Sequence, residues 1–152
     1  MELADGLAMR LEALYEGAER PEEVELAYII KGRNNIVNKM AELIGSANDG
    51  SFLMTSNDWV LRRVGRALVS ARRRGIRINI AADVGDEAVP EGVEVNKRLT
   101  CDCCILIVDM RTLFSVSNWT EGNAYAMMTQ DKSLITMCRE YYENPKCCCN
   151  LE

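Results

Sequence analysis

Thiols are the side chains of this sequence with the clearest capacity for chemistry. Seven cysteines occur in 152 residues, and five of them form two groups, Cys101 with Cys103 and the run Cys147, Cys148 and Cys149. Because side chains alternate along a strand, the first two would point to one side and form a two-ligand unit. The three later thiols could close the site from the same or a partner subunit. Thiolates suit Zn²⁺, Cu(I) or an iron–sulfur cluster as cofactor.

Other interpretations of the cysteines stay open. Cys104 lies in an apolar run and Cys138 on the apolar face of the last expected helix, so both also suit a core. No CxxC pair with zinc-ribbon spacing occurs. A thiol enzyme would need a basic partner, and only Lys97 and Arg98 are close in sequence to the first group. The sequence contains no histidine, which excludes imidazole bases, His-containing triads and mixed Cys/His zinc sites.

The stretch from residue 98 to 119 positions the first thiol group. An apolar run at 103–108 is followed by Asp109 and a second strand-like run at 113–116, which predicts a buried hairpin. Around it, periodicity and turn residues predict helix 2–19, strand 24–31, helix 34–47, strand 51–55, helix 59–74, strand 76–82, loop 83–92, strand 93–97, strand 124–129 and helix 131–142. Ser56, Asn57 and Asp58 offer an N-cap for the helix at 59–74. This order indicates an α/β fold with a mixed β-sheet flanked by helices.

Charge is unevenly distributed. The net charge is −5, whereas residues 1–25 alone carry eight acidic residues and two arginines, so the remainder is close to neutral. Helix 59–74 carries an arginine-rich side that could face DNA or could simply be solvated, and the second interpretation is favoured. No run reaches the ~18 apolar residues of a membrane span, and no secretory signal is present. We therefore expect a soluble, cytoplasmic protein without membrane contact.

The order of five segments resembles the C-terminal effector domain of the archaeal TrmB-like transcriptional regulators, over about residues 2–143. The segments are AYIIKGRNNIVNKMAELIGSAN, SFLMTS, VGRALVSARRRGIRINIAAD, CCILIVDMRTLFSVSN and AYAMMTQDKSLITMCREYY. The resemblance implies a phospholipase D-like effector domain at 22–143, preceded by a linker and dimerisation helix at 1–20. Residues 144–152 would be a Cys-rich tail that ends in the cloning residues Leu151 and Glu152.

The same resemblance implies partners. Family members place a winged helix before the linker, and this sequence lacks one, so we expect a fragment that forms a homodimer and meets DNA only through the absent winged helix. The effector would be a small molecule or a metal. The sugar-binding portion of longer members would lie beyond the end of this chain.

Active members of the phospholipase D superfamily carry HxKxxxxD followed by GSxN. Aligned on Asp109, this sequence has Asp102 at the histidine position and Cys104 at the lysine position. Downstream, Ser117 and Asn118 fall in the GSxN register, where only the asparagine is kept. Phosphodiester cleavage needs a nucleophile and positive charge, so the resemblance implies a protein that is not an enzyme. Asp109 is then better interpreted as a strand-end or turn residue than as a catalytic one.

Two hypotheses result. The first is a non-catalytic regulatory domain whose degraded active-site pocket, formed by Asp102, Asp109, Ser117 and Asn118, binds an effector. The alternative is a cysteine-based metal, iron–sulfur or redox sensor in which the two thiol groups are the sensing element.

Overall fold

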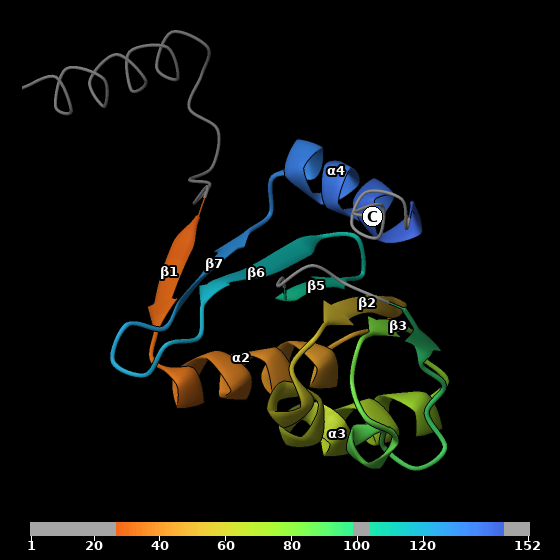
Figure 1. The fold of residues 1–152 in the computed structure, drawn as a ribbon. Coiled ribbons are helices and arrows are strands. Elements are labelled where there is room, and N and C mark those ends of the chain that lie inside the picture. The colour runs from red at the N-terminus through yellow and green to blue at the C-terminus, as the bar shows by residue number, and fades with distance from the viewer. Residues whose placement is uncertain (1–26, 99–103, 145–152) are drawn as a thin grey trace, which may run out of the picture.

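The computed structural model describes residues 27–98 and 104–144, which form one mixed sheet with helices on both faces (Figure 1). The elements in chain order are β1 (Tyr28–Lys31), α2 (Arg33–Gly45), β2 (Gly50–Thr55), α3 (Asp58–Arg73), β3 (Arg77–Ala82), a 3₁₀ turn (Asp86–Ala88), β4 (Asn96–Lys97), β5 (Cys104–Val108), β6 (Thr112–Asn118), β7 (Tyr125–Thr129) and α4 (Lys132–Glu143). The expected linker helix at 1–20 and the tail after Asn144 lie outside the described residues.

The sheet has the strand order β1-β7-β6-β5-β2-β3-β4. β2 pairs in parallel with β3, and β3 with β4, whereas the pairs β1–β7, β6–β7, β5–β6 and β2–β5 are antiparallel. The predicted mixed sheet flanked by helices is therefore confirmed.

Alternating side chains divide the interior into two layers. In β5, Cys104, Leu106 and Val108 belong to the core shared with α2 and α3, while Ile107 belongs to a smaller core against α4. Figure 1 shows α2 and α3 together on one face of the sheet and α4 on the other. Full burial of a residue such as Leu106 contributes about 1.5–3 kcal/mol relative to exposure, so both faces must be covered for the sheet to be stable.

Several boundaries differ from the expected ones. The strand expected at 93–97 is reduced to Asn96–Lys97, because the backbone amide of Val93 donates to the carbonyl of Pro90 and its side chain turns into the core. The second strand of the hairpin, expected at 113–116, extends to Asn118. In the part of the chain that the structure describes, no helix is long and apolar enough to cross a membrane.

Candidate functional site

A polar cavity of about 520 Å³ opens where three neighbouring strands end. Thr55, the last residue of β2, pairs with Cys104 at the start of β5, which in turn pairs with Val116 near the end of β6. The described wall of the cavity consists of Ser56, Asn57, Asp58, Cys104, Val116, Ser117, Asn118, Trp119 and Thr120.

The N-terminus of α3 forms one side of the cavity. The Asn57 side chain accepts hydrogen bonds from the backbone amides of Trp59 at 2.9 Å and Val60 at 3.4 Å. The backbone amide of Asn57 itself donates to Thr55 Oγ1 at 3.1 Å. The predicted N-cap is confirmed. Because the cap already uses these amides and Asp58 adds a negative charge, the helix end is a poor anion site.

Two tryptophans contact each other at the cavity, and one of them is part of its wall. Trp119 lines the cavity and meets Trp59 edge to face, with ring centroids 5.7 Å apart and planes at 86°. The guanidinium groups of Arg33 and Arg63 lie 4.4 and 5.2 Å from the Trp59 ring centroid. Such cation–π contacts contribute about 0.5–1 kcal/mol each at exposed sites, so they rigidify this wall.

The end of β6 supplies Ser117 and Asn118. The pairing with β7 is irregular between Val116 and Asn118, which interrupts the ladder at this point. Ser117 is exposed at the cavity, and Asn118 Oδ1 accepts from the backbone amide of Thr120 at 2.8 Å. The structure therefore brings these two predicted pocket residues together.

Asp109 lies elsewhere, which corrects the expectation that it shares a pocket with Asn118. β5 runs from Cys104 at the cavity to Val108, and Asp109 follows in the turn at the far end of the hairpin. The antiparallel register pairs Val108 with Thr112, so the remaining length of β6 separates the carboxylate from Asn118. Counting residues along the sequence could not show this separation, because it depends on how β6 folds back.

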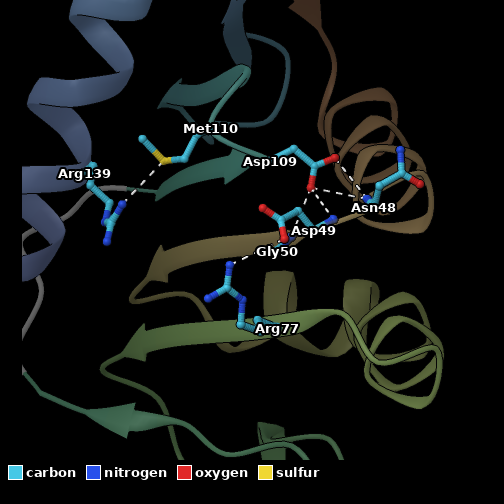
Figure 2. A network of polar contacts seen from close by, with 7 residues as sticks. All are labelled: Asn48, Asp49, Gly50, Arg77, Asp109, Met110 and Arg139. Atoms are coloured by element: carbon cyan, nitrogen blue, oxygen red, sulfur yellow. Dashed lines mark hydrogen bonds and ion pairs between the residues drawn. The ribbon is translucent and has the colours of Figure 1, made fainter.

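The role of Asp109 is structural. Its carboxylate accepts from the backbone amides of Asn48 at 3.0 Å, Asp49 at 2.7 Å and Gly50 at 3.0 Å (Figure 2). Its φ of 55° is in the left-handed region, as suits a turn. Burial disfavours the charged carboxylate, but these three donors and the charge of Arg111 outweigh it and hold the pKa below its ordinary value. The prediction of a strand-end or turn residue is confirmed.

The family of this chain can now be given. The family model described as "Transcriptional regulator TrmB, EBD N-terminal subdomain" matches residues 26–145. The chain belongs to this TrmB family. No curated protein sequence matches it.

Solved structures share the fold of this TrmB-family domain. TrmBL2, described as an archaeal chromatin protein with a novel mode of DNA binding, is 17% identical with a TM-score of 0.64, covering 92% of this chain and 60% of that chain. NucT from Helicobacter pylori is 19% identical with a TM-score of 0.62, covering 84% of this chain and 98% of that chain. Nuc from Salmonella typhimurium, a phospholipase D family member, is 17% identical with a TM-score of 0.58, covering 78% and 93%. The predicted phospholipase D-like fold is confirmed, and the chain spans 60% of the length of TrmBL2.

The remaining predicted site residues of this TrmB-family domain lie outside the described residues. These are Asp102, Cys101, Cys103, Cys147, Cys148 and Cys149. Within 27–98 and 104–144, no three Cys, Asp or Glu side chains gather as a metal site would require.

Of the two described cysteines, Cys104 is buried in the core, as predicted, whereas Cys138 is only partly buried. Cys104 is 2% exposed in the main core. Cys138 packs against Ile107 and Leu113, and burial raises the pKa of its thiol, which disfavours thiolate chemistry. The structure adds that Cys104 also forms part of the cavity wall.

Sequence reasoning missed the contribution of Trp119 and Thr120, and it identified Ser56, Asn57 and Asp58 only as a helix cap. Their position directly after β2 and β6 was the available signal. These two strands run in the same direction on either side of β5, so the residues that follow them lie at one edge of the sheet.

Proposed function

We propose that this TrmB-family domain is a non-catalytic regulatory domain that senses a small, polar, uncharged effector in the cavity at the N-terminus of α3. One observation carries the proposal. Among the described residues of the wall, Asp58 is the single charged side chain, and the others offer hydroxyl, amide, thiol, indole and alkyl groups.

The composition of the wall argues against phosphodiester cleavage. A phosphodiester needs cationic groups that stabilise the developing negative charge. Cys104 stands where the resemblance places the phosphate-binding lysine, and its thiol is buried. Asp102, at the position that the resemblance gives to the nucleophilic histidine, is an acid and cannot supply the cationic charge. Paired donors and acceptors on Ser117 and Asn118 instead suit a ligand rich in hydroxyl groups.

The regulatory context follows from the family. We propose that the domain acts in the cytoplasm as a homodimer joined through residues 1–20, and that a winged helix outside this sequence contacts the promoter. Sedimentation tests the dimer: the full chain should sediment as a dimer at micromolar concentration, and a chain lacking residues 1–20 as a monomer. A monomeric full chain would contradict this part of the proposal.

Tryptophan fluorescence tests the effector site, because Trp119 lines the cavity and the second tryptophan, Trp59, contacts Trp119. Glycerol, erythritol and myo-inositol serve as neutral polyol probes, and inorganic phosphate as an anionic comparison. At least one polyol should shift the emission with saturation, and phosphate should not. Trp119→Phe should remove most of the change while leaving Trp59 as a folding reporter. Saturable binding of phosphate alone would contradict the proposed ligand class.

Catalysis is tested separately with bis(p-nitrophenyl) phosphate. We expect no release of nitrophenol above the buffer rate. Hydrolysis that Ser117→Ala or Asn118→Ala reduces would show that the cavity is an active site and would overturn the non-catalytic assignment.

The alternative proposal is a cysteine-based sensor for a metal, an iron–sulfur cluster or the redox state, built from Cys101, Cys103 and the three later thiols. One observation favours it: Cys104, which directly follows this first group, lies in the cavity wall. A cluster beside the cavity could then alter the same surface that an effector would occupy.

A further inference from the structure

Arginine is concentrated on one helix. Seven of the 18 lysine and arginine residues of the chain lie between Arg62 and Arg77, and no acidic residue occurs from 59 to 82. The structure places all seven on α3 or directly after it, and all seven are exposed.

Three of the seven stabilise the fold locally. Arg63 donates to Asn34 Oδ1 at 3.2 Å, and Arg77 pairs with Asp49 at 3.4 Å. Arg74 donates to two backbone carbonyls at the end of α2, at 3.1 and 3.2 Å. Contacts within the fold therefore account for these three side chains, and no ligand is needed to explain them.

The other four have no such contact with any described residue. One of them, Arg72, lies beside Gly92, and the remaining three are Arg62, Arg66 and Arg73. Their spacings of four and seven residues place them on one line along the outer side of α3. In the neighbouring loop, Asp86 pairs with Lys97 and not with these arginines. The helix thus presents three aligned guanidinium groups to solvent.

Two of these arginines share a shallow groove of about 330 Å³. Arg66 and Arg73 line it together with Gly65, Val69, Ser70 and Pro90. A guanidinium group matches a phosphate with two parallel hydrogen bonds, so two of them beside one groove suit an anionic backbone.

We propose that the outer face of α3 binds the phosphate backbone of duplex DNA without sequence preference, through Arg62, Arg66 and Arg73. The three Cα positions extend over roughly 16 Å along the helix, at 1.5 Å per residue, which is more than one phosphate group can bridge. Duplex DNA carries about one charge per 1.7 Å and satisfies all three. Single strands are bound through stacking on aromatic rings, and the one aromatic residue of α3, Trp59, is already stacked by arginines.

The experiment is fluorescence anisotropy with a labelled 20-base-pair duplex of random sequence, titrated with the full chain between 50 and 200 mM NaCl. Affinity should fall with salt, with a log–log slope of about −0.9 for each phosphate contacted. The variant Arg62→Gln/Arg66→Gln/Arg73→Gln should lower the affinity at 50 mM NaCl at least tenfold and make the slope shallower by about 3. Glutamine keeps the helix propensity of arginine, so α3 should stay folded.

A matched variant distinguishes the effect of losing these three arginines from the effect of losing three positive charges elsewhere. Lys31→Gln/Arg111→Gln/Lys132→Gln removes the same three charges from other exposed positions and should keep the affinity within about twofold. Equal losses in both triple variants would overturn the proposal, as would no binding of duplex at 50 mM NaCl or tighter binding of a single strand. If the α3 triple variant loses its helical circular dichroism signal, the three single substitutions Arg62→Gln, Arg66→Gln and Arg73→Gln are titrated instead. Each should change the salt slope by about 1, and no change in any of them would overturn the proposal.

Discussion

The carboxylate of Asp109 lies 2.7 Å from the backbone amide of Asp49, although the two residues are sixty positions apart in sequence. The same carboxylate accepts from the amides of Asn48 and Gly50, so the turn after β5 is tied to the start of β2 (Figure 2). These three amides precede or begin a strand and have no ladder partner at this point. The contact therefore replaces hydrogen bonds that water would otherwise have to supply.

Asp109→Asn should lower the free energy of unfolding by about 1–2 kcal/mol, because a neutral amide oxygen accepts more weakly than a carboxylate and only one oxygen remains. Asparagine tolerates the positive φ, so backbone strain does not contribute. Urea denaturation measures the change. Asp49→Asn is the control, since its exposed ion pair with Arg77 contributes little. Equal effects of the two substitutions would refute the role of Asp109.

The depressed pKa of Asp109 predicts a pH dependence of stability. A carboxyl group whose pKa is lower in the folded state contributes stability above its unfolded pKa, near 3.8, and loses it as the pH falls through the folded value. Urea midpoints should therefore drop below about pH 4 more steeply for the wild-type chain than for Asp109→Asn. Parallel curves for the two proteins would show that Asp109 titrates normally.

Asn57→Ala should destabilise the domain by about 1 kcal/mol, because two amides of the first turn of α3 lose their acceptor. Asn57→Asp preserves the cap and should be near neutral in effect. Thermal unfolding of the pair measures the difference. A destabilisation by Asp as large as that by Ala would point to a different role for this side chain.

The contact between α4 and the sheet depends on Ile135, which is 1% exposed and packs against Ile107 and Leu113. Ile135→Ala should cost about 2–5 kcal/mol, since it removes buried methyl groups and leaves a cavity. Met137→Ala on the same helix should have almost no effect, because Met137 is 64% exposed. Chemical denaturation of both variants provides the comparison.

The cysteine-sensor alternative predicts a bound metal. Anaerobically purified protein should then contain stoichiometric zinc, copper or iron, with visible absorption in the iron case. Cys101→Ser/Cys103→Ser should release it, whereas Cys138→Ser should not, because Cys138 lies on α4 and packs against the smaller core. Seven freely titrating thiols without metal would eliminate the metal and cluster forms of this alternative.

Local patterns were sufficient to predict most elements. The apolar run before Asp109 and the second run after it predict the β5–β6 hairpin, and Asn57 predicts the start of α3. The length of the short strand β4 was overestimated, because a turn places Val93 in the core. Burial of Val93 depends on contacts with residues far from it in the sequence. Of the four predicted pocket residues, Ser117 and Asn118 line the cavity, Asp109 does not, and Asp102 lies outside the described residues.

By itself, the sequence determined the kinds of elements, the absence of histidine chemistry and the concentration of arginine in one helix, because these depend on residue type and spacing alone. Only the tertiary structure decided which side chains meet. The antiparallel return of β6 separates Asp109 from Asn118, while the ends of β2 and β6 and the start of β5 meet at the cavity. Neighbours across the sheet are set by strand pairing, whose register depends on residues far apart in the sequence. Likewise, the arginines that support the fold can be told from those left open on α3 only by their contacts in the folded chain.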